Sequence, residues 1–502
     1  MRKFLWVVGV GALVLALAAP AMALDFKFGG DYRVIFVSYE NAVTANTISN
    51  SFGAVDGAAG GAHQRDTYIR FMPRFETSDD NGNIQTMLRF RIGFTRFGDG
   101  GGASGSGGGK TGFILGGTNF SQRVGETSGG ALGNRGVNVA TSWMYLDFAA
   151  PWGIPLRVRA GMQPLYWHKG IVIDDSMSGV RLYGSVKPFT YEAGWYRAIG
   201  GPTNTTATPS GAVGIFGTSA AYDNNYDFYR FAVGMEVAKE FNATVDFVYG
   251  DNRVGCTPVS NAPATCASTT DRVRPVYYGG LAVKGAIGIV SYDFDFVYGF
   301  ADGGMNGTFG QTQNAAGQLT GQHTVRGWAL DAGVHFPIGP VTVSPIVLYG
   351  TGDDPGSGGS QAFPGGISPA WTGSGSFELL GNGGAIDRVT VTQSSVTNLW
   401  ALGLVFEYRP VKAMYTKFAW GYAGFAKKNG NCSFGQAPCY GPSYPGRGDK
   451  PLAGKNTLGN ELSFRADYEL YTGFKVMSTI GWFIPSRGDV AQEYALQLLY
   501  YF

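Results

Sequence analysis

Charged side chains form two groups at the polar positions of segments that alternate apolar and polar residues. Arginines make up the group in the first third of the sequence, and acids predominate in later segments. The two sets are Arg33, Arg70, Arg74, Arg89, Arg91, Arg157 and Arg159, and Asp293, Asp295, Asp331, Glu407, Glu461, Asp467 and Glu469, with Arg465 among the acids. Residues two apart share one face of a β-strand. A basic wall opposite an acidic wall sets a field across an aqueous passage, as charged rings do in ion-selective pores. The alternative is that these charges only solvate the face or pair with one another.

The elements that carry these charges alternate apolar and polar residues. Between Ile289 and Phe300, apolar side chains take every second position and Ser291, Asp293 and Asp295 lie between them. A soluble sandwich would turn the apolar face to a core and a membrane barrel would turn it to lipid. One segment therefore does not decide between the two folds.

The number and length of such segments favour the membrane barrel. Eighteen are predicted, over 25–39, 65–77, 84–97, 138–148, 156–164, 178–187, 190–198, 226–237, 242–250, 271–284, 289–300, 324–336, 341–350, 397–409, 413–423, 457–470, 475–483 and 492–502. Most approach the roughly 9 to 11 residues of a tilted membrane-spanning strand. Short turns, such as Pro188-Phe189, alternate with long Gly-rich connectors, such as 98–137, as periplasmic turns and outer loops do. We predict an all-β, antiparallel transmembrane barrel. Weak patterning over 178–198 and 471–491 leaves 16 or 20 strands open, and Pro73 and Pro345 indicate bulges or misplaced boundaries.

Both ends of the chain carry targeting features. Residues 1–23 combine Arg2 and Lys3, an apolar run and Ala21-Met22-Ala23, the pattern of a cleaved signal peptide, which leaves 24–502 as the barrel domain. The last strand alternates apolar residues into Tyr500 and a final Phe502, the form that barrels present to their insertion machinery. We therefore expect the outer membrane of a Gram-negative bacterium, with the lipid bilayer and lipopolysaccharide as surroundings.

Composition excludes several other classes. Of 502 residues, 79 are Gly and 14% are aromatic, while only 15% are charged, which excludes a disordered chain. After the signal, no apolar run reaches the roughly 20 residues of a membrane helix. Without Arg2 and Lys3, basic and acidic residues both number 36, so no bulk charge points to nucleic acid. The cysteines fall in two close pairs, Cys256 with Cys266 and Cys432 with Cys439, which in an oxidising compartment predicts two local disulfides.

One connector differs from the Gly-rich loops. Residues 163–178 contain Tyr166, Trp167, His168, Lys169, Asp174 and Asp175. This segment is a candidate constriction loop that folds inward and sets Asp174 and Asp175 against the arginines. The alternative is that it covers the outer mouth of the barrel. The same two acids, and Asp353-Asp354, offer oxygen ligands for Ca²⁺, but neither pair has an EF-hand repeat. No cofactor is predicted.

Several short motifs resemble a known family. They are Gln64-Arg65-Asp66, Phe97-Gly98-Asp99, Gly129-Gly130-Ala131-Leu132-Gly133, Arg159-Ala160-Gly161-Met162-Gln163 and Ile173-Asp174-Asp175. Together they look like the homotrimeric outer-membrane porins of sulfate-reducing bacteria. Gly350-Thr351-Gly352-Asp353-Asp354-Pro355 is similar to a Gly-Asp element of several porin families. The resemblance implies a homotrimer and passive diffusion of small hydrophilic solutes, and it transfers no substrate. The Gly-rich loop and the cysteine pairs depart from it.

We therefore expect a water-filled channel, because a barrel of 16 to 18 strands encloses one and no plug domain precedes the first strand. The arginines predict a leaning towards anions. Two alternatives stay open: a barrel that sheathes a partner such as a cytochrome, and a substrate-specific uptake or export channel. An enzyme is not expected, because the four histidines have no Ser partner at an interpretable spacing.

Overall fold

A computed structural model describes residues 25–40, 43–44, 64–96, 139–151, 153–199, 226–238, 240–252, 274–301, 312–313, 319–320, 324–352, 361–365, 376–380, 389–390, 396–427, 457–486 and 490–502. The predicted signal peptide and both cysteine pairs lie outside these residues. None of the helices within the described ranges has the length and apolar character needed to cross a membrane.

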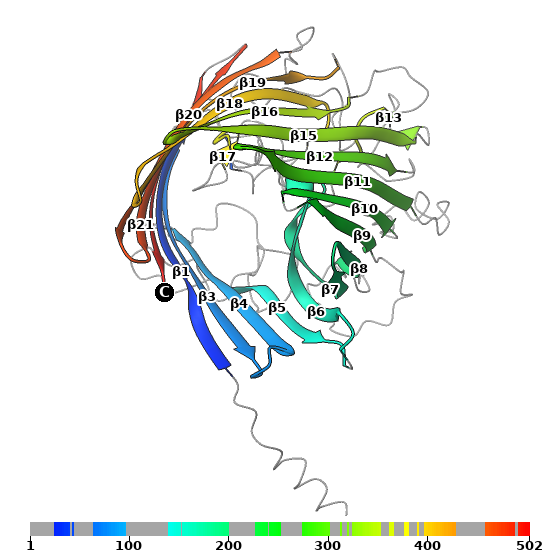
Figure 1. Ribbon diagram of the computed structural model, residues 1–502. Coiled ribbons are helices and arrows are strands. Elements are labelled where there is room, and N and C mark those ends of the chain that lie inside the picture. Colours follow the sequence, from blue (N-terminus) through cyan, green and yellow to red (C-terminus); the bar gives the residue numbers. More distant parts are fainter. Residues whose placement is uncertain are drawn as a thin grey trace, which may run out of the picture.

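Strands make up nearly all of the described structure (Figure 1). Eighteen of them form one sheet. They are β1 (Asp25–Glu40), β3 (Gln64–Ser78), β4 (Ile84–Arg96), β5 (Val139–Ala149), β6 (Leu156–Trp167), β7 (Ile173–Val186), β8 (Phe189–Ile199), β9 (Tyr226–Ala238), β10 (Phe241–Asn252), β11 (Arg274–Ile287), β12 (Val290–Ala301), β15 (Val325–Ile338), β16 (Val341–Gly350), β18 (Leu399–Val411), β19 (Met414–Phe425), β20 (Thr457–Tyr471), β21 (Phe474–Pro485) and β22 (Ala491–Tyr501). The short strands β2 (Val43–Thr44) and β17 (Val389–Thr390) pair with each other, as do β13 (Thr312–Gln313) and β14 (Leu319–Thr320). The helix η1 (His168–Gly170) lies between β6 and β7.

The sheet closes on itself. Every strand pairs antiparallel with its neighbours in the chain order of the sheet, and β1 pairs with both β3 and β22. The closing register sets Tyr32 opposite Tyr500. Two-residue connections join six of the strand pairs at one end, among them β11 to β12 and β20 to β21. The predicted 18-stranded antiparallel barrel is therefore confirmed.

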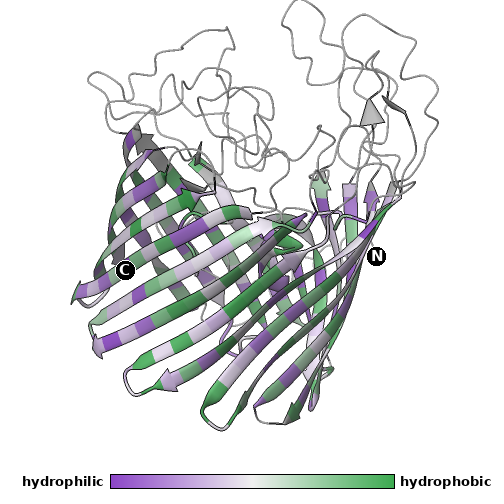
Figure 2. Ribbon diagram, turned by 90° about the horizontal axis from the view of Figure 1, so that it is seen from above, coloured by the Kyte–Doolittle hydropathy of each residue, from purple (hydrophilic) through white to green (hydrophobic). Residues whose placement is uncertain are grey.

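The two faces of the wall differ as the period of two predicts. Outward positions are apolar and exposed: Val233, Val245 and Ile338 are each more than half exposed. Along the strands of Figure 2, apolar and polar residues alternate. The outward Trp328 stacks on Tyr349 and the outward Trp400 meets Tyr422 edge-on, whereas Trp143 is on the inner face opposite Arg89. The apolar band is the surface that a lipid bilayer would cover.

The last residue takes part in closing the barrel. The backbone of Phe502 exchanges two hydrogen bonds with Gly30 of β1, at 3.1 and 3.2 Å. Its ring stacks near those of Phe28 and Phe71, with centroids 5.3 and 5.8 Å away. A Cβ at Gly30 would meet the ring of Phe502 and the backbone of β3, so this position needs glycine. The predicted insertion signal is thus also the seam of the folded barrel.

The two strand prolines are neither bulges nor misplaced boundaries. Pro73 lies inside β3 and Pro345 inside β16, and no register shift accompanies either of them. The β3–β4 ladder is interrupted at Met72 and Pro73, and the β15–β16 ladder at Ser344 and Pro345. The missing N–H of each proline thus coincides with a local break in one ladder, which corrects the sequence-based interpretation.

Candidate functional site

The tip of the β6–β7 hairpin leaves the barrel wall. β6 pairs with β5 only as far as Met162, and β7 pairs with β8 only from Ser178. Residues 163–177, called here the inner hairpin, pair only with each other among the strands. Gly161, with φ of +125°, stands at the departure point, and a Cβ there would meet the backbone of β5. In Figure 1 the hairpin tip, drawn in cyan, lies inside the ring of strands near β11 and β12.

One face of the inner hairpin packs on the inner wall. Leu165, Trp167 and Ile173 are buried, and the Trp167 ring meets Tyr196 of β8 edge-on with centroids 5.5 Å apart. The opposite face points away from this wall, and Tyr166 on it is 57% exposed. The predicted constriction loop is therefore a paired hairpin with a tip of a few residues, which corrects its description as a loop.

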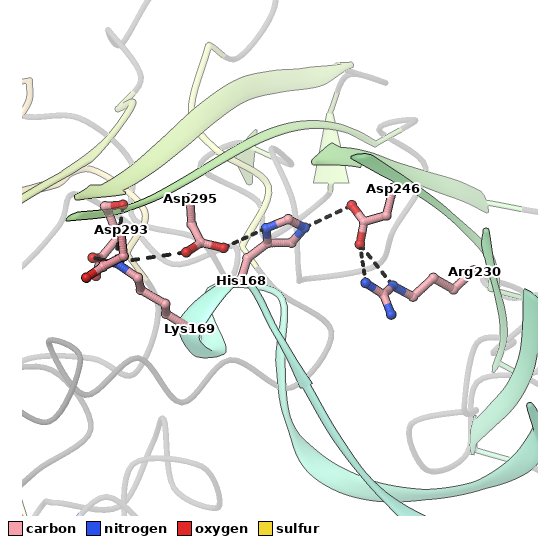
Figure 3. A network of polar contacts seen from close by, with 7 residues as sticks. His168, Lys169, Arg230, Asp246, Asp293 and Asp295 are labelled. Carbon is pink, nitrogen blue, oxygen red and sulfur yellow. Dashed lines mark hydrogen bonds and ion pairs between the residues drawn. The ribbon is translucent and has the colours of Figure 1, made fainter. Parts of the chain in front are cut away.

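The tip is fastened by charged side chains of three wall strands (Figure 3). His168 Nε2 lies 2.9 Å from Asp246 Oδ1 of β10, and Nδ1 lies 3.1 Å from Asp295 Oδ1 of β12. The Lys169 ammonium contacts Asp293 of β12 and lies 2.7 Å from Asp331 of β15. The hairpin thus reaches across the inner faces of β8 to β15.

Both cations of the tip are held in their charged forms. Burial lowers the pKa of His168, but its hydrogen bonds to Asp246 and Asp295 outweigh burial and raise it to about 9. Burial likewise lowers the pKa of Lys169, and the charges of Asp331 and Asp293 raise it above its usual value. His168 therefore carries a proton at neutral pH.

The tip backbone is strained. His168 and Lys169 both have φ of +51°, a left-handed conformation that costs a residue with a Cβ roughly 1 to 2 kcal/mol. Such strain persists only where surrounding contacts impose it. The imidazole also occupies the space that a Cβ at position 280 of β11 would need, and this position is Gly280. Wall and tip are thus fitted to each other.

The predicted arginines lie on the inner face of β1, β3, β4 and β6, where Arg33 is opposite Arg70, Arg74 is opposite Arg89, and Arg159 is opposite Asp147. Arg91 and Arg157 lie two positions from Arg89 and Arg159 and therefore share their face. Two aspartates that the sequence analysis did not single out stand among them. Asp31 lies 2.5 Å from Arg33 and 3.2 Å from Arg89. Asp147 lies 2.8 Å from both Arg157 and Arg159 and accepts a hydrogen bond from Tyr183.

The basic wall continues beyond the predicted set. Arg181 of β7 and Arg230 of β9 both pair with Glu192 of β8, at 2.6 and 2.9 Å. Arg230 also pairs with Asp246 at 2.7 Å, which joins this chain of charges to His168. Aromatic rings lie beneath the guanidinium groups: Arg89 is 4.3 Å from the Trp143 centroid and Arg230 is 4.8 Å from that of Trp167. Apolar and polar residues also alternate along β7 to β9. The same rule therefore predicts that Arg181, Glu192 and Arg230 face inward.

A second connector also enters the barrel. Residues 361–365 and 376–380, between β16 and β18, are called here the inner segments. Phe377 occupies the space above Gly403 and Gly421, and Pro364 that above Gly299, all on inner faces of the wall. The Glu461 carboxylate of β20 accepts the backbone N–H of Glu378 at 2.6 Å, of Leu380 at 2.7 Å and of Leu379 at 3.3 Å. Lys417 of β19 lies 3.1 Å from Glu378 in a buried ion pair.

The predicted acids therefore have different surroundings. Asp295 and Asp331 are buried beneath the hairpin tip, and Glu461 is fully buried beneath the inner segments. Glu461 thus does not line open space, which corrects its assignment as pore-lining. Glu407 accepts a hydrogen bond from Tyr415, and Asp467 pairs with Arg465 at 2.6 Å.

Asp174 and Asp175, the last two candidates of the inner hairpin, lie at the start of β7. Asp175 is exposed and its carboxylate accepts the backbone N–H of Ser176, while Asp174 is half-buried. Asp353 and Asp354 lie outside the described residues. Within the part of the chain that the structure describes, no three His, Cys, Asp or Glu side chains are grouped to hold a metal ion.

Comparisons with known proteins find this architecture in solved structures. No protein-family model matches the chain, and no curated protein matches it. Pseudomonas aeruginosa OccK8 (OprE) is 13% identical, with a TM-score of 0.51 over 95% of this chain and 98% of that one. The outer membrane protein OpdK from Pseudomonas aeruginosa is 10% identical, with a TM-score of 0.50 over the same shares. OpdK with vanillate gives 9% and 0.51.

The fold and the interior together define the class of structure. The chain has the closed 18-stranded antiparallel barrel that it shares with OccK8 and OpdK, narrowed from within by the inner hairpin and the inner segments. At 9 to 13% identity this likeness establishes the fold, and function has to be argued from the interior of this chain.

Proposed function

We propose that the chain is an outer-membrane porin: a water-filled channel through which small hydrophilic solutes and ions diffuse, with a preference for anions. The observation that carries the proposal is a closed barrel with an apolar outer face and a charged inner face, narrowed by a hairpin fastened inside it. A lining of fixed charges keeps water in the passage and excludes large apolar molecules.

The balance of charge along the wall supports the preference for anions. On the basic side, Asp31 is shared by two arginines and Asp147 by two more, so each trio keeps an excess positive charge. On the acidic side, Asp295 and Asp331 are covered by the cations of the hairpin tip. The charges left facing the passage are therefore mainly positive.

The same interior argues against a sheath for a threaded partner. A sheath requires a wide lumen, whereas two connectors of this chain occupy the interior of the barrel. A substrate-specific channel remains the second candidate, because arginines of β4, β6, β7 and β9 each set a guanidinium group over an aromatic ring. Saturable block of conductance by one solute would distinguish it from a general porin.

We further propose the cellular setting that the sequence predicts. The chain is exported by a cleaved signal peptide, inserted into the outer membrane of a Gram-negative bacterium through recognition of Tyr500 and Phe502, and surrounded by lipid and lipopolysaccharide. The homotrimer rests on the resemblance of its motifs to porins of sulfate-reducing bacteria. Chemical cross-linking of the purified protein, read by mass, tests the trimer.

Planar-bilayer recording tests the channel itself. The purified wild-type protein should give steady single-channel conductance in KCl, and a KCl gradient should give a reversal potential of the sign for anion flow. A cation-selective reversal potential would contradict the charge argument, and correctly folded barrels that never conduct would contradict the channel.

A further inference from the structure

Side-chain contacts hold the inner hairpin in its place inside the barrel. Among the described strands, none of the wall pairs with it beyond Met162 and Ser178, so the wall ladders of the described residues do not fix where its tip lies. The apolar face around Trp167 holds the body of the hairpin, and the fully buried Ile171 and Val172 extend this packing up to the tip. The strained tip is held by the ion pairs of His168 and Lys169.

The geometry at His168 requires a particular protonation state. Each ring nitrogen faces a carboxylate oxygen, at 2.9 and 3.1 Å, and the side chain is 4% exposed. An ionised carboxylate only accepts hydrogen bonds, so both ring nitrogens must donate, and only the imidazolium has two N–H groups. A neutral ring would set one nitrogen lone pair against a carboxylate in a buried place.

Further charged groups lie beside the two carboxylates that contact His168. Asp246 on β10 also accepts two hydrogen bonds from Arg230 of β9, at 2.9 and 2.7 Å. Asp295 on β12 has the Lys169 ammonium 3.9 Å away. On β11 the facing residue is Gly280, which carries no charge.

The outer contacts of the cluster complete this set. Seen from His168, Glu192 of β8 forms an ion pair with the far side of Arg230, and Asp331 of β15 forms one with Lys169. Asp293 contacts both Lys169 and His335.

We propose that His168, as an imidazolium between Asp246 and Asp295, is the residue that positions the inner hairpin, so that loss of its proton releases the tip and widens the passage. This inference rests on the proposed channel function. Released, the tip also carries His168 and Lys169 away from four wall carboxylates. The passage then becomes both wider and less selective for anions.

Protonation gives the direction and the pH range. The pKa of His168 is raised from 6.5 to about 9, so the ion pairs stabilise the docked tip fully below pH 6.5, and that stabilisation is lost as pH rises through about 9. At pH 7 about 99% of the rings are protonated, and at pH 10 about one tenth are. Lys169 and Arg230 keep their charge over this range because carboxylates raise the pKa of Lys169 and a guanidinium titrates far higher.

The test is single-channel recording of the full-length protein in KCl from pH 7 to pH 10, for wild type, H168Q and H335Q. His335 is the matched control, because it lies in the same interior and pairs with Asp293 but belongs to the wall strand β15. Wild type and H335Q should show a reversible rise in conductance centred within about one pH unit of 9, with a shift of the reversal potential away from anions. H168Q should show the higher conductance already at pH 7 and no step.

A second measurement keeps the test independent of conduction. Hydrogen exchange at pH 7 should be faster in residues 163–177 of H168Q than of wild type, with the wall strands unchanged and an unaltered β-sheet circular dichroism spectrum. A wild-type conductance equal at pH 7 and pH 10, or a step retained in H168Q, overturns the role of His168 and leaves the channel standing. No conductance at any pH in folded wild type overturns both.

Discussion

Replacing Glu461 with Ala should release the inner segments from the wall. Glu461 binds three consecutive backbone N–H groups, and two of these bonds are short, at 2.6 and 2.7 Å. A buried hydrogen bond to a charged group contributes roughly 1.5 to 3 kcal/mol, so the two together stabilise docking by about 3 to 6 kcal/mol. Since 1.4 kcal/mol is about a factor of ten, the undocked fraction should rise by about two to four powers of ten.

Hydrogen exchange at neutral pH measures this effect directly, because the amides of Glu378 and Leu380 are themselves the donors. They should exchange faster in E461A, and a larger, noisier channel conductance should accompany the change. S463A is the matched control: Ser463 lies on the same face of β20, is fully buried, and its hydroxyl has no hydrogen-bond partner among the residues that the structure describes. Equal protection of these amides in E461A and wild type would refute the reasoning.

Three further substitutions test the wall. Replacing Arg89 and Arg91 together with Gln should shift the reversal potential towards cations, while the circular dichroism spectrum stays that of a folded barrel; unchanged selectivity would exclude these two arginines from the filter. Asp147→Asn should increase anion preference in the same recording, because one carboxylate offsets two arginines, and a decrease would contradict this balance. Gly30→Ala should lower the midpoint of thermal unfolding, because its Cβ meets Phe502 and β3 at the seam, and an unchanged midpoint would show that the seam adapts.

The barrel wall was predictable from the sequence because a strand has a period of two and the two faces of this wall meet different surroundings. Phe294 and Asp295 differ by one position and point to opposite faces, so alternation alone assigned both. The same rule placed the arginines of β1 to β6 on the inner face. The period of two also assigns Arg181 and Arg230 to the inner face of β7 and β9.

What occupies the interior was not predictable from alternation. Once β6 leaves the wall after Met162, the period of two no longer separates inside from outside, so Tyr166 faces the interior from a nominally outward position. The entry of the inner segments depends on Gly403 and Gly421, which leave space for Phe377 from a distant connector. Only the fold brings such residues together, and for the same reason the burial of Glu461 was missed.

The most direct test of the central claim is the reversal potential of the purified wild-type protein in a planar bilayer under a KCl gradient at pH 7. The account predicts open channels whose reversal potential has the sign of anion preference, because the arginine wall keeps an excess of positive charge facing the passage. A reversal potential of the opposite sign, or folded barrels that do not conduct, would contradict it.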